Sequence, residues 1–445
     1  MISLHYYDST TPPPVLFPDN MPPSFFSRWL AYAGIPRSFV WMYFNIALYA
    51  LCFQMQGVST PYLIKSLVGA GGDVTRAFTA LKTANGVAQM VGSLLSGALL
   101  DVLGCRAVML LSFGASLLSY GLAAVPSANV WLLFYAQLPT LLQHAMLAAQ
   151  FFVSVKAAPE QRAILLGYIS VCYGVGVVVG PALGGALSAV DLRLPSAVAA
   201  AGSALSLVLT LADPETATAA TALAAAAAAP AAARSKDAGD APLPSSLAAF
   251  VTEPVLLSRF ALKALFSSSL ALFYAVYQLL ALDHFGLDVR AAGVLTSFIG
   301  AVGVATQAGG LSALKARFSE ARILTACAAV LVLSFAAFAV ISSAAELFVL
   351  VVPLVVANTL FQTINTSQIL AATERKGAAA AINMAIFSGL RMVMPAAGNA
   401  LLASAGFWSI GASASAASAA MLAVMLLFPA CVEATTGAKQ PPKRD

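Results

Sequence analysis

The sequence has very few charged residues. Asp, Glu, Lys and Arg together make up 9% of the 445 residues, whereas 60% are hydrophobic. An ordinary soluble domain carries about 25% charged residues, because it needs them to cover its surface in water. The shortage excludes cytosolic enzymes and solvated scaffolds as first interpretations, and it indicates a multi-span membrane protein.

Cysteine is scarce as well, and its pattern carries no chemistry. The five cysteines are scattered and form no CxxC pair, so neither a disulfide framework nor a zinc site is indicated. Because HExxH, P-loop and clustered His/Asp patterns are also missing, we expect no enzyme activity, no cofactor and no metal centre. The net charge of +5 is spread along the chain, which argues against a nucleic-acid partner. Residues 1–27 lack the features of a cleaved signal peptide.

Long apolar stretches recur along the chain instead. Each covers about 18 to 25 residues, enough for a helix to cross the ~30 Å hydrocarbon layer of a bilayer. Six precede the middle of the chain and six follow it, at about 38–62, 82–103, 107–125, 129–153, 163–188 and 195–212, then 258–282, 290–312, 322–342, 346–371, 378–402 and 407–429. The sequence thus predicts an all-α polytopic membrane protein with twelve transmembrane helices.

The two halves of the sequence repeat the same order of apolar stretches and charged hinges. A charged hinge follows the second and the fourth predicted helix of each half, at 101–106, 156–162, 315–322 and 374–376. This repeat predicts two pseudo-symmetric six-helix bundles that flank a central cavity. The domains we expect are an N-terminal tail at 1–37, bundles at 38–212 and 258–429, an Ala-rich linker at 213–257, and a C-terminal tail at 430–445. A thirteenth span in the alanine run is disfavoured, because Pro230 interrupts the run and Ala contributes little to insertion.

The basic residues set the expected orientation. Most of the 23 Lys and Arg fall in the tails, the linker and the hinges that share one side. The positive-inside rule assigns that side, with both termini, to the cytoplasm. Lys82 falls on the opposite side, at the start of a predicted helix. Lys263 lies about five residues inside a predicted helix, and we expect its side chain to extend to the cytoplasmic interface.

One hinge and one helix carry recognisable motifs. The first hinge combines Gly97, Asp101, Gly104 and Arg106, a pattern that suits a tight turn with a carboxylate at the membrane edge, and we predict that it acts as a cytoplasmic gate. The fifth predicted helix carries a GxxxGPxxGG pattern formed by Gly176, Gly180, Pro181, Gly184 and Gly185. Glycines four residues apart share one helix face and permit close packing, whereas a nucleotide-binding glycine loop would need a preceding strand.

These motifs resemble those of the major facilitator superfamily and of its drug:proton antiporter branch. The fourth and fifth predicted helices also look like those of the organic-cation-transporter-like, tetracycline-transporter-like solute carriers. The resemblance implies the major facilitator fold and a polyspecific transporter of organic ions or drugs, with protons as the coupling ion. The hinge departs from the family pattern at Val102, where a basic residue is usual. Proton coupling is left open by Gln137, which stands where the antiporter branch usually has an Arg, and by the absence of a carboxylate from the middle of the predicted spans.

Polar residues within the predicted spans are the candidates for the substrate path, because they are costly in lipid. Arg391 lies near the midplane and suits anion binding or gating, or a structural pairing with backbone or amide groups. His144 is the candidate proton carrier, and a packing role is the alternative. The neutral candidates are Gln54, Gln143, Tyr277, Gln278, Gln362 and Asn365.

Carboxylates are missing from the middle of every predicted span. An organic cation in a dry site gains most from a buried carboxylate, so we expect a neutral, zwitterionic or anionic substrate. The predicted function is secondary transport of small organic solutes by alternating access, in the plasma membrane or an endomembrane, by a monomer. The alternative is a membrane receptor or scaffold that retains the fold without transport.

Overall fold

The computed structural model describes residues 37–69, 73–126, 129–157, 159–213, 254–373 and 376–429. The predicted tails and nearly all of the predicted linker lie outside these residues. Every regular element within the described ranges is helical, and ten stretches are long and apolar enough to cross a membrane. The chain is therefore a multi-pass integral membrane protein, and the predicted all-helical class is confirmed.

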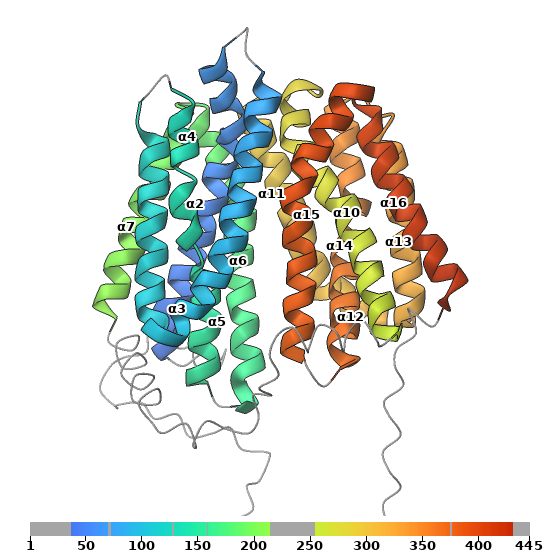
Figure 1. Ribbon diagram of the computed structural model, residues 1–445, viewed down its shortest axis with the longest axis horizontal. Coiled ribbons are helices and arrows are strands. Elements are labelled where there is room, and N and C mark those ends of the chain that lie inside the picture. Colours follow the sequence, from blue (N-terminus) through green and yellow to red (C-terminus); the bar gives the residue numbers. More distant parts are fainter. Residues whose placement is uncertain are drawn as a thin grey trace, which may run out of the picture.

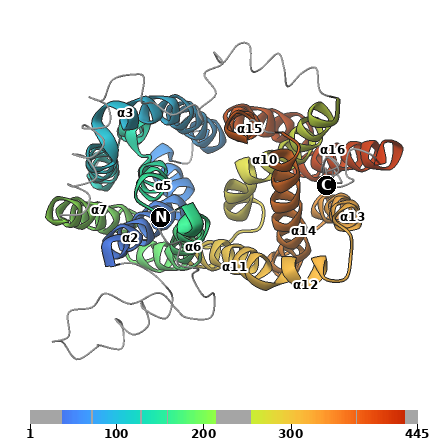
Figure 2. The same ribbon diagram turned by 90° about the horizontal axis from the view of Figure 1, so that it is seen from below.

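The helices stand in two groups (Figures 1 and 2). The N-terminal group holds α2 (Arg37–Val68), α3 (Val74–Ala124), α4 (Trp131–Tyr135), the 3₁₀ turn η1 (Leu138–Leu142), α5 (Ala145–Lys156), α6 (Pro159–Ser188) and α7 (Leu194–Ala212). The C-terminal group holds α10 (Pro254–Asp283), α11 (Val289–Ala305), the π turn η3 (Thr306–Gly310), α12 (Leu311–Lys315), α13 (Glu320–Phe338), α14 (Ala344–Ala371), α15 (Lys376–Ala405) and α16 (Trp408–Leu427).

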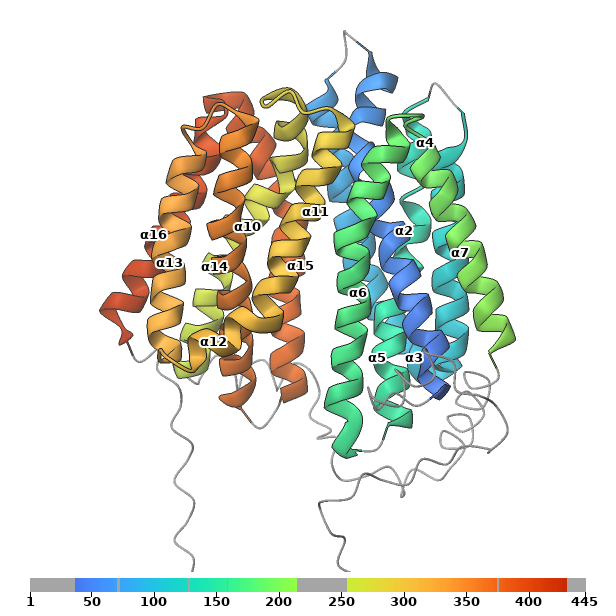
Figure 3. The same cartoon turned by 180° about the vertical axis from the view of Figure 1, so that it is seen from behind.

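The two groups are aligned, so that the helices of both begin and end at the same two ends of the molecule. The helix α2 begins and α16 ends at the lower end of Figure 1, which we call the terminal end. The opposite end is called the far end. Seen from behind, α6 of the N-terminal group runs beside α11 of the C-terminal group (Figure 3).

The acidic side chains that the structure describes lie at or beside the ends of helices. Asp73 and Asp288 cap α3 and α11 by accepting hydrogen bonds from backbone amides, each at 2.8 Å. Glu346 completes a capping box with Ser343 at the start of α14. These caps satisfy amide groups that a helix start leaves without intrahelical partners. The acids thus stabilise helix ends, which agrees with their absence from the predicted span centres.

The hinge between the second and third predicted spans consists of a single non-helical residue, whereas the sequence predicts a hinge over 101–106. The helix α3 continues through both spans and departs from helical geometry only at Gly104, where φ is +77°. Residues with a Cβ rarely adopt this conformation, so glycine allows the chain to change direction within one residue. The prediction also starts this helix too late. It begins at Val74 rather than at 82, and Lys82 therefore lies inside the helix.

The fourth predicted span is not one helix. It consists of α4, the turn η1 and α5, with non-helical backbone at Gln143 and His144. Pro139 accounts for the end of α4 at Tyr135, because it has no N–H to donate and its ring clashes with the carbonyl four residues earlier. A smaller irregularity, the π turn η3, interrupts the predicted eighth span.

Candidate functional site

The two groups meet along α6 and α11. A Cβ added at Gly174 would lie 3.3 Å from Val304 Cγ2, and the amide of Ala182 donates a 2.8 Å hydrogen bond to Ser297 Oγ. Nearer the far end, a Cβ added at Gly185 would lie 2.6 Å from the carbonyl oxygen of Val289. The two backbones therefore touch from the middle of the helices to their far ends.

Further contacts close the far end between α2 and the C-terminal group. The Tyr62 hydroxyl donates a 2.8 Å hydrogen bond to the carbonyl of Leu287. Lys65 Nζ lies 3.0 Å from Asp283 Oδ1, in an ion pair whose side chains are about half exposed. An apolar contact between Val58 and Val289 adds to this closure. Toward the terminal end, the ribbons of the two groups diverge (Figures 1 and 3).

The remaining glycines of the GxxxGPxxGG motif face α2 within the N-terminal group. A Cβ at Gly176 would lie 2.5 Å from Ala50 Cβ, and one at Gly180 would lie 2.9 Å from Gln54 Cβ. At Gly184 the added atom would overlap the carbonyl oxygen of Met55. The motif thus serves two contacts, since three glycines pack on α2 and Gly185 packs on α11.

A pair of cations lies between the two groups, one from each. Arg391 lies about 22 Å along α15 from its start, and Lys82 lies about 12 Å along α3 from its start. The helices are in close contact here, because a Cβ at Gly86 would lie 3.4 Å from Met392 Cα and 3.5 Å from the Arg391 carbonyl oxygen. Arg391 is exposed, and Lys82 is partly exposed.

The Arg391 guanidinium is within electrostatic range of two residues of the N-terminal group, Lys82 on α3 and Tyr173 on α6. Its Cζ lies 5.6 Å from the centre of the Phe387 ring. Sequence reasoning found Arg391 but missed Lys82 and Tyr173. The N-cap Asp73 was the available signal, because a helix that starts there carries Lys82 two turns inside.

His144 and Gln143 lie at the break in the fourth predicted span, within the N-terminal group. The Tyr49 hydroxyl donates to the Gln143 carbonyl at 3.0 Å, and the His144 amide donates to Ser112 Oγ at 3.2 Å. The side-chain Nε2 atoms of Gln143 and His144 are buried without hydrogen-bond partners among the described residues. A Cβ at Gly92 of α3 would lie 2.6 Å from His144 Nε2, so α3 packs directly on the break.

The other polar candidates are dispersed. Tyr277 and Gln278 line a small enclosed pocket at the far end, where the Tyr277 hydroxyl lies 3.1 Å from Thr296 Oγ1. Gln54 lies against the glycine motif, as described above. Gln362 and Asn365 belong to α14. Asn365 is buried, and its Nδ2 atom has no hydrogen-bond partner among the residues that the structure describes.

Lys263 does not extend to an interface, and that prediction is wrong. The structure buries its side chain completely, where Nζ donates to Gln362 Oε1 and lies 5.8 Å from the centre of the Phe266 ring. Because α10 is packed between α14, α15 and α16, the side chain is enclosed before it could reach the helix end.

The gate residues of the first hinge surround the change of direction in α3. Gly104 forms it, and Arg106 Nη2 donates a 2.8 Å hydrogen bond to the carbonyl of Leu211 at the end of α7. Gly97 has open space where a side chain would be, and the side chain of Asp101 lies outside the described part of the structure. Among the described residues, no three His, Cys, Asp or Glu side chains lie together in a group that could hold a metal ion.

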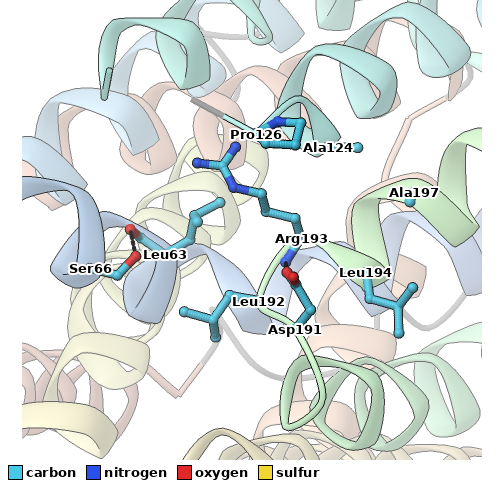
Figure 4. Close-up of a pocket in the computed structure, with 9 residues that line it drawn as sticks. All are labelled: Leu63, Ser66, Ala124, Pro126, Asp191, Leu192, Arg193, Leu194 and Ala197. Atoms are coloured by element: carbon cyan, nitrogen blue, oxygen red, sulfur yellow. Dashed lines mark hydrogen bonds between the residues drawn. The ribbon is translucent and has the colours of Figure 1, made fainter. Parts of the chain in front are cut away.

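A surface pocket of about 550 Å³ lies at the far end of the N-terminal group, between α2, α3 and the α6–α7 turn (Figure 4). Arg193 extends across it and donates to the carbonyl of Val125, while its own amide donates to Asp191. None of the predicted site residues lines this pocket. The candidate site is therefore the region between the two groups, around Lys82, Tyr173 and Arg391.

Known proteins with similar sequences are solute carriers and drug-resistance proteins. Over 372 residues the chain is 31% identical to human Solute carrier family 67 member A1, covering 80% of this chain and 84% of that protein. It is 27% identical to mouse Solute carrier family 22 member 18, covering 66% of this chain and 71% of that one. A shorter match, 33% identical, covers 32% of this chain and 35% of Tetracycline resistance protein, class G, of Vibrio anguillarum.

Solved structures of transporters share the fold. A peptide transporter POT in complex with sulfate superposes with a TM-score of 0.66 at 18% identity, covering 91% of this chain and 96% of that one. A variant of the nucleoside transporter NupG superposes with a TM-score of 0.65 at 15% identity, covering 87% and 99%. The family model described as Major Facilitator Superfamily matches residues 42–385, which confirms the resemblance seen in the motifs. The chain belongs to the Major Facilitator Superfamily, and it is a secondary transporter of small solutes.

Proposed function

We propose that the chain moves small organic solutes by alternating access, with twelve membrane-spanning helices in two pseudo-symmetric bundles at 38–212 and 258–429. An internal correspondence supports the duplication. Gly184 of α6 packs on α2, the first helix of its group, and Gly398 of α15 packs in the same way on α10, where an added Cβ would lie 2.6 Å from Val276 Cγ1. Two related halves around a central site are the architecture on which rocking transporters depend.

The contacts between the groups support the mechanism. They are concentrated from the middle to the far end, through the α6–α11 interface and the Lys65–Asp283 ion pair. Transport then requires the far end to open while the terminal end closes, so that the site between the groups faces each side in turn. The gate around Asp101 and Arg106 lies at the terminal end, where it would hold the second state.

The orientation and the coupling complete the proposal. The basic residues of the hinges support a cytoplasmic location for both termini, and with that orientation the conformation described here faces inward. His144 is the candidate group for a coupled proton, because its Nε2 atom is buried beside α3 without a hydrogen-bond partner in the described part of the chain. The substrate is neutral, zwitterionic or anionic, since the described carboxylates lie at helix ends. We propose a monomer in the plasma membrane or an endomembrane.

The single observation that carries the proposal is the one-sided closure between two helical groups. Flux measurements with purified protein in proteoliposomes test it, using neutral, anionic and cationic aromatic solutes, with and without an imposed pH gradient. We expect saturable uptake of at least one neutral or anionic solute. Uptake no faster than in empty liposomes for every solute would favour the receptor or scaffold alternative instead.

A further inference from the structure

We infer that Lys82 and Arg391 together bind one negatively charged group of the substrate, so that the solute is an organic anion held between the two halves. The inference rests on the proposed function and deepens it, because it names the substrate class and the residues that select it. A carboxylate, sulfate or phosphate group attached to an apolar body is the chemistry that this pair fits.

The first support is the position of the two cations. They come from opposite groups, Lys82 from α3 and Arg391 from α15, at the level where Gly86 brings the two backbones into contact. Both lie well inside their helices rather than at helix ends, where long basic side chains reach the membrane surface. The Tyr173 hydroxyl of α6, in electrostatic range of Arg391, adds a neutral hydrogen-bond donor.

The second support is the charge around them. Neither cation forms an ion pair with a carboxylate among the described residues, although the two are close enough to repel each other. The described acids are engaged elsewhere. Asp73 caps a helix, Asp283 pairs with Lys65, and Glu320 pairs with Lys315 at 2.6 Å. Two like charges that lie close together repel each other, and an anion between them relieves that cost.

The third support is access. Arg391 is exposed although its backbone packs tightly against α3, and Lys82 is partly exposed. A dissolved anion can therefore reach both groups. Lys263 is the useful contrast within the same protein, because its ammonium group is fully buried and already donates to Gln362. It offers no accessible charge to a substrate.

One consequence concerns the transport cycle. Because the cations belong to different groups, a shared anion attracts both halves toward itself, and without it their repulsion opposes closure of the terminal end. The loaded carrier therefore closes more readily than the empty one. Binding energy from the anion is in this way directed into the conformational change rather than only into affinity.

The test uses three solutes with the same aromatic body: naphthaleneacetate, naphthaleneacetamide and naphthalenemethylamine. Binding to the purified full chain is measured by ligand-induced thermal stabilisation, and uptake is measured in proteoliposomes. We expect the order acetate, then acetamide, then amine. Lys82→Gln and Arg391→Gln should each weaken acetate binding by about tenfold to about a hundredfold, as expected for a charge-assisted contact, and leave acetamide binding nearly unchanged.

The controls separate this inference from general damage. Arg391→Lys and Lys82→Arg keep the charge and should retain most of the acetate binding, whereas Arg76→Gln removes an exposed cation near the start of the same α3 helix and should have no effect. If the two Gln variants fail to fold, the inference is tested by the order in which the wild-type protein binds the three solutes. A preference for the amine, or equal loss of acetate and acetamide binding in the Gln variants, would overturn the inference. Saturable uptake of any of the three solutes would still support the proposed transport function. If none of the three is taken up, both the proposed function and this inference are contradicted.

Discussion

Replacing Gly293 by Ala perturbs the contact that closes the far end. A Cβ added at Gly293 would lie 2.5 Å from the carbonyl oxygen of Pro181 and 2.9 Å from the Cα of Gly185, both on α6. Both neighbours are backbone atoms that no rotamer change can move away, so α6 and α11 must separate. Overpacking of this kind costs about 1 to 3 kcal/mol, which corresponds to about a 5-fold to 150-fold shift toward the state in which these helices are apart.

Labelling of a single cysteine measures that shift. Gln278 lines the enclosed pocket at the far end, so Gln278→Cys, in a chain without its native cysteines, should react with a membrane-impermeant maleimide only when the far end opens. We expect Gly293→Ala to raise the labelling rate by the factor above. Gly167→Ala is the matched control on α6, because no atom of the described residues lies within 4 Å of the added Cβ. Equal labelling rates in the two variants, with equal melting temperatures, would refute the reasoning.

Three further predictions follow from single contacts. Lys65→Asp should weaken closure of the far end by about 0.2 to 1 kcal/mol, as expected for an exposed ion pair, and the double variant with Asp283→Lys should close normally again. An unchanged labelling rate of Gln278→Cys in the Lys65→Asp variant would contradict this. Asp101→Asn should abolish transport while the melting temperature stays the same, and normal turnover in proteoliposomes would count against its gate role. Lys263→Met should leave the melting temperature unchanged or higher, since it removes a fully buried charge whose partners among the described residues are a neutral amide and the Phe266 ring. A loss of several degrees would show that the charge stabilises the fold.

The helices could be predicted from the sequence because each span is a long apolar run between charges. Their irregularities could not. Pro139 lies in a run whose hydropathy is that of an ordinary span, and only the backbone shows that three short helical pieces replace one helix. The sequence predicts a turn around Gly104, but it cannot tell a loop of several residues from a single residue with positive φ.

Of the two cations in the candidate site, one could be predicted from the sequence. Arg391 stands out because it is charged and central in its apolar run. Hydropathy places Lys82 at the very start of its helix because it sets the helix start eight residues too late, and only the Asp73 cap marks the true start. The proximity of Lys82 and Arg391 joins positions more than 300 residues apart, which a single sequence does not encode in any local pattern.

The most direct test of the central claim, that two halves move about a shared anion, is a pair of spin-label distances measured with and without naphthaleneacetate. Labels at Val155 and Phe318 report the terminal end, and labels at Val190 and Val340 report the far end; all four positions are exposed. We predict that naphthaleneacetate shortens the first distance and populates longer values of the second, and that the Lys82→Gln, Arg391→Gln double variant shows neither change. Distances that do not change when naphthaleneacetate is added, or that change equally in the double variant, would contradict the account.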